Sequence, residues 1–403
     1  MWQMRIVLYP IVLFAVQVSG CIQSPEQNAF EPNIPDGEHI QIDEIASLTP
    51  VMQTKRAEGL KDQGGKVLRG VHPKSHGCVQ GEFTVFGSEE LGSEFRRGIF
   101  AKAGRKYNAD IRFSNAEVHT GGDLDGGNGS RGMAIKLYDV DGEVFIKDNS
   151  QKNQDFLMIN TPEFAFRNIT DYGRLTRALE ASKNAVDTKD YSDFAFEPPK
   201  DEAEKEKLIA GLKATGRVVG GIKSRTVRNP VFVQYFGAAP FLFGQGKAMK
   251  FSAKPKMCPP KPATAAFKSK LGEAEKNFSS SEKAVLGPNY LRDALTKTVE
   301  AEEVCFDFMI QVRDKSEVDM LQIEDATTQW EDELDNYVAV ALLRIKSGQL
   351  PQSDKSIATC EALAFTPWHS LKEHQPLGSI NRLRRDVYQG SSYHRLEAET
   401  KTD

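Results

Sequence analysis

The chain has 403 residues, with 52 lysines and arginines against 56 aspartates and glutamates, so its formal net charge is −4 at pH 7. Such mild acidity gives no electrostatic case for binding nucleic acid, and we expect no nucleic-acid partner. The five cysteines include no C-x-x-C pair, which argues against a structural zinc site.

The first twenty residues have the pattern of an export signal. Arg5 precedes an apolar run, Ile6–Val16, that is too short to span a bilayer and is typical of a signal-peptide core. The following Val18-Ser19-Gly20-Cys21 resembles the bacterial lipobox. The resemblance predicts a signal peptide over residues 1–20, a lipid on Cys21 that anchors the protein to a membrane, and a location in the bacterial periplasm or cell envelope. Ordinary cleavage by a signal peptidase near the same place is the alternative.

The next segment, residues 21–47, is polar and contains three prolines. This composition is typical of a flexible tether, which would let a domain stand away from the membrane. Residues 48–403 show no internal repeat and no linker rich in proline or in serine and glycine. We therefore predict one large domain whose structure begins near Ser47.

The pattern of apolar residues along the domain predicts both strands and helices. The expected strands are Cys78–Phe86, Asp110–Val118, a hairpin within Met133–Ile146, Val304–Val312 and Asn336–Ile345. The expected helices are Tyr172–Val186, Asp201–Thr215, Asn289–Glu303 and the basic run Ser379–Leu396. Because helices are inserted between strands without regular alternation, the pattern predicts an α+β fold with an antiparallel sheet or barrel.

Four cysteines follow Cys21, and their state is not decided by their spacing. An exported protein could join them as two disulfides, in any of three full pairings, and the spacing favours none. Buried thiols are the simpler assumption for Cys305, and an inert strand thiol is the expectation for Cys78.

Two of the seven histidines, His72 and His76, lie four residues apart. Their spacing suits zinc binding by a helix, but Pro73 and Gly77 argue against a helix that carries both. Taken alone, this stretch leaves a catalyst, a metal ligand and a structural residue open for each histidine.

Four separated stretches together resemble the signatures of the heme catalases. They are Arg69-Gly70-Val71-His72-Pro73-Lys74, Ile111-Arg112-Phe113-Ser114, Arg131-Gly132-Met133-Ala134-Ile135-Lys136, and Asn160-Thr161-Pro162 followed by Phe164 and Arg167. Their order and spacing match the amino-terminal half of the catalase core. Later segments such as EHQPLGSINR are similar to small bacterial catalase-related heme proteins. The resemblance implies a catalase-like antiparallel β-barrel with inserted and carboxyl-terminal helices, and heme b as cofactor.

The resemblance also implies roles for individual residues. His72 corresponds to the essential histidine on the peroxide side of the heme, Asn160 to the amide that orients peroxide, and Ser114 to the serine that holds the histidine. An imidazole, which titrates near pH ~6.5, can take a proton from bound peroxide and return it to the leaving oxygen. His76 has no counterpart in the family.

The implied heme contacts use residue types that suit them. The forked guanidinium of arginine suits the carboxylate of a heme propionate. The residues concerned are Arg69 and Arg112 for the propionates, Val71 for the heme face and Phe164 for the pocket wall. Ala165 replaces a second phenylalanine of the family, and this change would open that side of the pocket.

The chain departs from the family on the other face of the heme, where catalases ligate iron through a tyrosinate. Aligning Pro367 with the family's proline places Thr366 where the tyrosine should be. His369 and His374 are then the candidate iron ligands, and either would make the iron resemble that of peroxidases. Tyr388 lies downstream and could reach the iron only if this segment folds differently from the family.

These observations predict an enzyme that decomposes or uses peroxide, with peroxidase-like turnover favoured because the ligand tyrosine is missing. The electron donor is not identified by the sequence, and both monomer and oligomer stay open. One alternative is isomerisation or cleavage of lipid hydroperoxides. Ala165 and the predicted membrane anchor favour this alternative. A second alternative is a heme-binding lipoprotein without turnover.

Overall fold

A computed structural model describes residue 34 and residues 36–59, 66–116, 120–124, 129–147, 151–181, 198–316, 320–330 and 336–400. The predicted signal peptide and Cys21 lie outside this part of the chain. Among the described helices, none is both long and apolar enough to cross a bilayer.

An antiparallel β-barrel forms the centre of the molecule. The order of hydrogen-bonded strands is β5-β4-β3-β2-β1-β9-β8-β7-β6, and β5 also pairs with β7, so eight strands close on themselves and β6 extends β7. The strands are β1 (Ser75–Val85), β2 (Lys106–Asn115), β3 (Arg131–Leu137), β4 (Gln154–Ile159), β5 (Tyr235–Phe236), β6 (Phe241–Leu242), β7 (Lys247–Lys256), β8 (Val304–Asp314) and β9 (Val338–Ile345). The predicted α+β fold with an antiparallel barrel is confirmed.

Alternation along the strands divides the barrel residues between an inner and an outer face. Ile111, Ile135, Phe156 and Phe308 are fully buried, and the rings of Phe156 and Phe308 lie 4.6 Å apart inside the barrel. Residues of opposite parity, including Arg112, face the layer outside the barrel. The outer face of β1 to β4 therefore carries the polar residues that the motifs place there.

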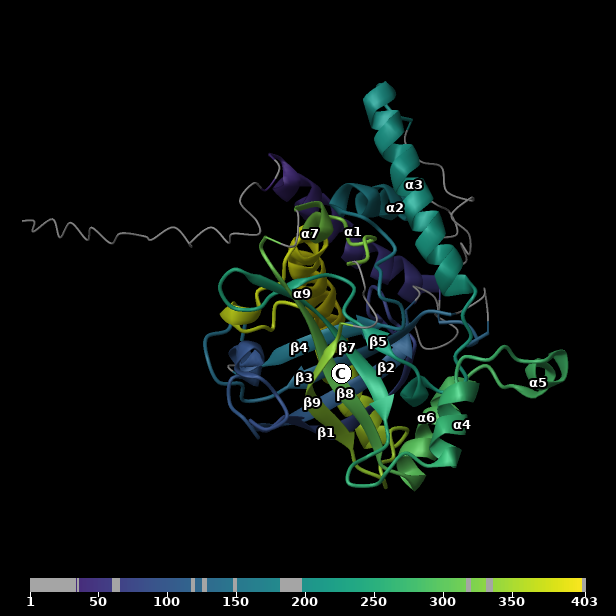
Figure 1. Cartoon of the computed structure of the whole chain (residues 1–403). Coiled ribbons are helices and arrows are strands. Elements are labelled where there is room, and N and C mark those ends of the chain that lie inside the picture. Colours follow the sequence, from purple (N-terminus) through teal and green to yellow (C-terminus); the bar gives the residue numbers. More distant parts are fainter. Residues whose placement is uncertain are drawn as a thin grey trace, which may run out of the picture.

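Helices cover the barrel at two places (Figure 1). In one group, α1, α2 and α9 contact one another, and α4, α5 and α6 lie at the other end of the barrel. The helices are α1 (Glu38–Gly59), α2 (Ile169–Ala181), α3 (Glu202–Lys223), α4 (Ala265–Glu273), α5 (Ser280–Val285), α6 (Tyr290–Ala301), α7 (Met320–Glu324), α8 (Asp354–Ala362) and α9 (Ser379–Thr400). Shorter 3-10 turns are Ser93–Phe95, Gly98–Phe100, Pro230–Phe232 and Lys372–His374.

The folded part begins earlier than predicted. Helix α1 starts at Glu38 rather than near Ser47, and its packing explains why. Glu38 is 6% exposed and accepts hydrogen bonds from both Nε and Nη2 of Arg382 on α9, the latter at 2.9 Å. Ile45 is buried beside α2 and α9. The segment from Glu38 to Ser47 thus belongs to the domain and not to the tether.

The predicted hairpin within Met133–Ile146 is wrong in its second half. Strand β3 ends at Leu137 and pairs with β4, which begins seventeen residues later at Gln154. The intervening loop turns at Asp139, whose φ is 55°, and then reaches across to another segment, where Val144 forms a bridge with Leu371. The sequence has the composition of a turn here, but the chain after the turn pairs with Leu371 instead of returning along β3.

All four described cysteines form disulfides, so the expected free thiols at Cys78 and Cys305 are wrong. Cys78 of β1 is joined to Cys360 of α8, and Cys258 is joined to Cys305 of β8. In each pair the two residues are distant in sequence, with separations of 282 and 47 residues. Contacts between strands and helices, rather than local spacing, bring the partners together.

Candidate functional site

His72 occupies a strained turn just before β1. Its φ of 56° lies in the left-handed region, which non-glycine residues adopt at a cost of about 1–3 kcal/mol. Two contacts with β2 hold it: His72 Nδ1 lies 3.0 Å from Ser114 Oγ, and Arg112 Nη2 donates to the His72 carbonyl oxygen at 2.9 Å. The strand thus fixes both the backbone and the ring of His72, as the sequence predicted for Ser114.

The two neighbouring histidines face different sides of β2. His76 is fully buried, and its Nε2 lies 2.9 Å from Asn115 Oδ1, whereas His72 contacts the adjacent Ser114. Because successive strand residues point to opposite faces, the two rings cannot share a metal ion in this arrangement. His76 belongs to a buried polar network and His72 to the outer face.

A glycine of β3 makes room for the His72 ring. A Cβ atom at Gly132 would lie 2.4 Å from His72 Nδ1 and 2.8 Å from Ser114 Oγ. Gly132 is paired with Ser114 on one side and with Ile159 on the other. The three residues lie side by side on β2, β3 and β4, and Asn160 follows directly after Ile159.

The substitution Gly132→Ala tests this close approach. We expect it to displace His72 and lower peroxide turnover by about 10²-fold, because catalysis is sensitive to misplacements of about 1 Å. Steady-state kinetics and a hemin titration would check the result. Gly216→Ala on α3 is the matched control, since a Cβ there meets nothing within 4 Å. Equal kinetics in the two variants would contradict the role of Gly132.

The surroundings of His72 favour its neutral form. Burial, followed by repulsion from Arg112, Arg384 and Arg69, lowers the pKa of His72 to about 3. An imidazole of this kind is uncharged over the physiological range and is therefore available to accept a proton. The cationic neighbours also place positive charge close to the ring.

Three histidines with lowered pKa values make a prediction about stability. Burial lowers the pKa of His72 and His76 to about 3 and that of His374 to about 4. Between pH ~6.5 and these values the unfolded chain binds protons that the folded chain cannot. The free energy of unfolding should therefore fall as the pH drops, by about 1.4 kcal/mol per pH unit for each histidine.

Urea unfolding between pH 6 and 5 measures this slope, and three histidines correspond to about 4 kcal/mol per pH unit. Above about pH 7.5 the contribution vanishes, because the unfolded histidines are then neutral as well. In His76→Gln the slope should decrease by about 1.4 kcal/mol per pH unit, because one fewer proton is bound on unfolding. A stability that is independent of pH in this window would contradict the neutral buried state.

Asn160 is 1% exposed and is held by the backbone around it. Its Oδ1 accepts a hydrogen bond from the Arg131 N–H at 2.7 Å, and its Nδ2 donates to the Gly129 carbonyl oxygen at 2.8 Å. One amide N–H remains for other contacts. The orientation of peroxide by Asn160 stays a prediction, in which only this N–H takes part.

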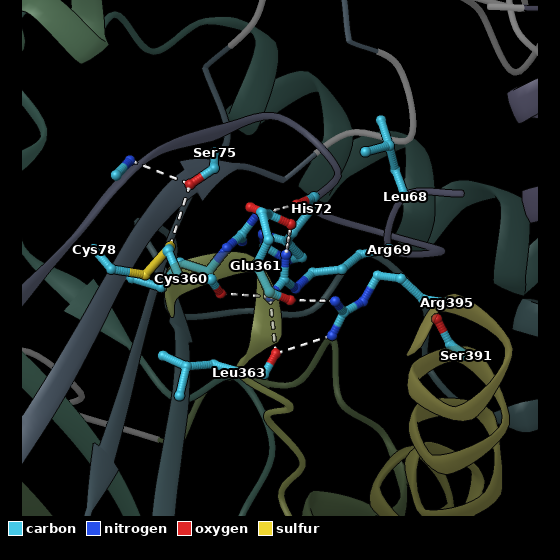
Figure 2. A network of polar contacts seen from close by, with 12 residues as sticks. Leu68, Arg69, His72, Ser75, Cys78, Cys360, Glu361, Leu363, Ser391 and Arg395 are labelled. Atoms are coloured by element: carbon cyan, nitrogen blue, oxygen red, sulfur yellow. Dashed lines mark hydrogen bonds and ion pairs between the residues drawn. A yellow bond between two sulfur atoms is a disulfide. The ribbon is translucent and has the colours of Figure 1, made fainter. Parts of the chain in front are cut away.

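A cluster of guanidinium groups lies beside His72, at the end of α8 (Figure 2). Arg69 forms an ion pair with Glu361 and donates to the Cys360 and Leu363 carbonyl oxygens at 3.0 and 2.9 Å. Arg395 of α9 donates to the carbonyl oxygens of Glu361 and Leu363. Two arginines from distant parts of the chain thus converge on one helix end.

The cluster carries more positive than negative charge. Burial tends to raise the pKa of Glu361, but Arg69, Arg112 and Arg395 outweigh burial and lower it. Burial and the neighbouring Arg69 hold the pKa of Arg112 well below its usual value. Arg112 is 4% exposed, and its Nε has no hydrogen-bond partner. Three guanidinium groups around one carboxylate form a site suited to further carboxylates.

Helix α9 also presents a tyrosine with an arginine partner. Arg384 Nη2 donates to Tyr388 Oη at 3.3 Å, and the guanidinium lies 5.1 Å from the centre of the Tyr388 ring. Arg384 is close enough to His72 to lower its pKa. Burial, and next the neighbouring Tyr388, raise the pKa of Tyr172 to about 12. Tyr388, Arg384 and His72 therefore belong to one region.

His374 does not suit the predicted role of iron ligand. It is fully buried, with its ring centre 5.6 Å from that of Phe100 and 5.9 Å from that of Phe243. The Ile99 N–H donates to His374 Nε2 at 3.2 Å, and Nδ1 lies 3.4 Å from the Leu242 carbonyl oxygen. Both ring nitrogens have hydrogen-bond partners, so this geometry gives no support to His374 as an iron ligand.

His369 belongs to a buried charge network. Its Nδ1 lies 2.8 Å from Asp155 Oδ2 and 3.1 Å from Lys136 Nζ, and the Thr366 N–H donates to the same Asp155 oxygen. Lys136 Nζ is 3.0 Å from Asp155 Oδ1. The carboxylate thus holds His369 in a structural network, and ligation of iron by His369 finds no support in the geometry.

The remaining predicted heme contacts are Val71 and Phe164. Val71 and Phe164 are partly buried. The Phe164 N–H donates to the Ala326 carbonyl oxygen at 3.0 Å, and the Phe164 ring lies 5.9 Å from that of Phe166. Their contacts with a heme stay predictions. Sequence reasoning missed Glu361, Arg395 and the pairing of Arg384 with Tyr388.

The barrel, the helices around it and the constellation at His72 define a catalase-like fold. No family model matches the chain, and no curated protein matches it by sequence. The structure is similar to a fungal catalase, with a TM-score of 0.58 and 16% identity over 82% of this chain and 59% of that one.

Two further catalases give the same result. A bacterial catalase has a TM-score of 0.55 and 15% identity, over 97% of this chain and 67% of its own. Catalase A from Saccharomyces cerevisiae has a TM-score of 0.57 and 15% identity, over 84% of this chain and 63% of its own. The chain spans 59% of the fungal catalase, and the likeness concerns the fold.

Proposed function

We propose that this protein binds heme b and decomposes peroxides. The observation that carries the proposal is a neutral histidine, held by Ser114 on the outer face of the barrel, beside a cluster in which guanidinium groups outnumber carboxylates. A neutral base next to fixed positive charge suits a reaction in which a proton leaves a bound oxygen.

The residues of the site fit a heme. Arg69, Arg112 and Arg395 would hold its two propionates, because the cluster has an excess of guanidinium groups and Arg112 Nε lacks a partner. Tyr388 would supply the oxygen ligand of the iron. When bound, heme supplies the redox capacity that cleavage of a peroxide bond needs.

The chain's own residues handle the proton. His72 would accept it from the peroxide and return it to the leaving oxygen, and Ser114 would keep the ring in place through Nδ1. The free N–H of Asn160 would orient the substrate. Arg384 would stabilise negative charge on the Tyr388 oxygen, to which it already donates a hydrogen bond.

Export and anchoring are part of the proposal. The amino-terminal pattern with Cys21 supports a lipid-anchored protein of the bacterial periplasm, similar to small bacterial catalase-related proteins. Two disulfides suit an oxidising compartment, because the cytosol keeps thiols reduced. The partners would be a peroxide, an electron donor and the membrane.

An absorption spectrum of the mature domain with added hemin tests the proposal. We expect stoichiometric binding with a Soret band whose ligand signature changes in Tyr388→Phe. In His369→Ala and His374→Ala the signature should persist, because these rings serve the charge network and the barrel core. Peroxide consumption should accompany hemin binding in the unaltered protein.

Two outcomes would overturn parts of the proposal. Absence of stoichiometric hemin binding would remove the heme and the chemistry assigned to His72. Hemin binding without turnover of either hydrogen peroxide or a fatty-acid hydroperoxide would leave a heme-binding protein and remove the catalytic role.

A further inference from the structure

The disulfide Cys78–Cys360 connects β1 to the end of α8. Strand β1 lies beside Arg112, and the end of α8 binds Arg69 and Arg395 of the guanidinium cluster. Cys78 lies opposite Arg112 in the register of β1 and β2. Cys360 belongs to the last turn of α8, where its own carbonyl oxygen and that of Leu363 accept hydrogen bonds from Arg69. The disulfide and the cluster therefore share one short segment (Figure 2).

The same helix end reaches two other elements of the site. Arg69 precedes His72 by three residues, and its ion pair is with Glu361, the residue after Cys360. Arg395 of α9 binds the carbonyl oxygens of Glu361 and Leu363. Movement of this turn would shift Arg69 and Arg395 together, and so would change the spacing of guanidinium groups on which binding of two carboxylates depends.

The environment of the sulfur atoms suits exchange with an external thiol. Cys78 is partly exposed, whereas Cys360 is 2% exposed. Ser75 Oγ lies 3.8 Å from Cys360 Sγ and can donate to it, and Arg69 lies against the same residue. Nearby positive charge and a hydroxyl donor favour a thiolate, which makes Cys360 Sγ the better leaving group.

We propose that Cys78–Cys360 is a redox-sensitive clamp on the guanidinium cluster, so that the disulfide form binds heme more tightly than the dithiol form. The proposal rests on the proposed heme site. An external dithiol would be the reductant. Its thiolate attacks Cys78 Sγ, and Cys360 Sγ leaves with the electron pair and takes up a proton. The second thiol of the reagent then releases Cys78, and the reagent becomes a disulfide.

The second disulfide provides a matched control within the same chain. Cys258 and Cys305 are 6% and 1% exposed, and they join the segment after β7 to the start of β8, whereas the cluster is formed by residues of β2, α9 and the turn before β1. The double variant Cys258→Ser/Cys305→Ser should therefore leave the cluster intact. The double variant Cys78→Ser/Cys360→Ser should imitate the reduced clamp.

The experiment measures two quantities in both double variants and in the unaltered protein, before and after dithiothreitol. The first is hydrogen exchange of the backbone amides in α8 and in residues 66–76 without hemin. The second is the dissociation constant for hemin, with circular dichroism used to keep to conditions where every sample is folded. We expect faster exchange and about tenfold or greater loss of hemin affinity after reduction and in Cys78→Ser/Cys360→Ser.

Reoxidation should restore the affinity, and Cys258→Ser/Cys305→Ser should respond to dithiothreitol as the unaltered protein does. Equal hemin affinity in the disulfide and dithiol forms would overturn the clamp while leaving the heme proposal intact. Absence of hemin binding in all samples would overturn the proposed function. The exchange data would then still decide whether the disulfide holds the end of α8.

Discussion

The substitution His72→Ala is expected to lower peroxide consumption by about 10²–10⁴-fold, the contribution typical of a positioned acid–base group. Binding of hemin should persist, because Arg69, Arg112 and Tyr388 are unchanged. His72→Asn accompanies it, since asparagine tolerates the left-handed backbone at this position, where φ is 56°. A similar loss in both variants would assign the effect to the imidazole and not to the turn.

The pH profile distinguishes a catalytic imidazole from a structural one. Because burial lowers the pKa of His72 to about 3, the ring stays neutral from pH 8 down to about 5. The rate attributed to His72 should be flat over this range and should fall only at lower pH, where the ring gains its proton. An acid limb near pH ~6.5 would instead mean that the ring titrates as an exposed histidine does.

His76 supplies the matched control for His72. It is also buried, and burial lowers its pKa to about 3, but its partner is Asn115 rather than Ser114. His76→Gln should reduce stability and leave turnover per bound heme unchanged. Ser114→Ala should lower turnover less than His72→Ala, because it removes an orienting contact and keeps the base. Unchanged turnover in His72→Ala would refute the catalytic assignment.

The arrangement of side chains around His72 was predictable because its signals are local. Each motif carries its own residues on one strand or turn, and the register then brings Ser114, Gly132 and Ile159 side by side. The sequence also distinguished the two histidines, since His72 had a counterpart in the catalase motifs and His76 had none. The sequence contained no signal for the left-handed backbone of His72, because a positive φ is expected at glycine and not at histidine.

The candidate iron ligands on the opposite side rested on an alignment anchored on Pro367, and the structure gives His369 and His374 other partners. The structure draws Thr366 and His369 toward Asp155, whose position on β4 is distant in sequence. A local signal for Tyr388 was available: Arg384 and Tyr388 are four residues apart in a predicted helix, so their side chains lie on one face. The electrostatic effect of Arg384 on His72 arises only in the fold, and without it nothing gave this pair priority over the histidines.

The disulfides show a different limit of sequence reasoning. Four cysteines allow three full pairings, and the correct choice depends on which strands and helices become neighbours. Cys78 and Cys360 are separated by 282 residues, and β1 and α8 are neighbours only through the tertiary fold. No short-range pattern contains this information. The same holds for Arg395, which reaches Leu363 from the last helix.

Among the substitutions, the largest expected effect on stability concerns Asp155 and its partners. Asp155 and Lys136 are fully buried, directly opposite each other on β4 and β3, with Lys136 Nζ 3.0 and 3.1 Å from the two carboxylate oxygens. The carboxylate also binds His369 Nδ1 and the Thr366 N–H. It therefore connects the barrel to the segment that follows α8.

Asp155→Ala is expected to lower the free energy of unfolding by about 3–5 kcal/mol, because it leaves the buried ammonium group of Lys136 without its carboxylate. Urea unfolding at pH 7.5 would measure the change. Asp141→Asn is the control, since Asp141 pairs with Lys102 at the surface, where the two side chains are 48% and 69% exposed. An exposed pair of this kind contributes about 1 kcal/mol or less.

The double variant Lys136→Met/Asp155→Leu separates charge from packing. Replacing both members of a buried ion pair by apolar side chains of similar size is often neutral, so this variant should be clearly more stable than Asp155→Ala. The hydrogen bonds from Asp155 to His369 and Thr366 would still be lost. Any remaining decrease in the free energy of unfolding, relative to the unaltered protein, then measures how much these bonds stabilise the segment after α8. If Asp155→Ala costs no more than Asp141→Asn, the network does not anchor that segment to the barrel.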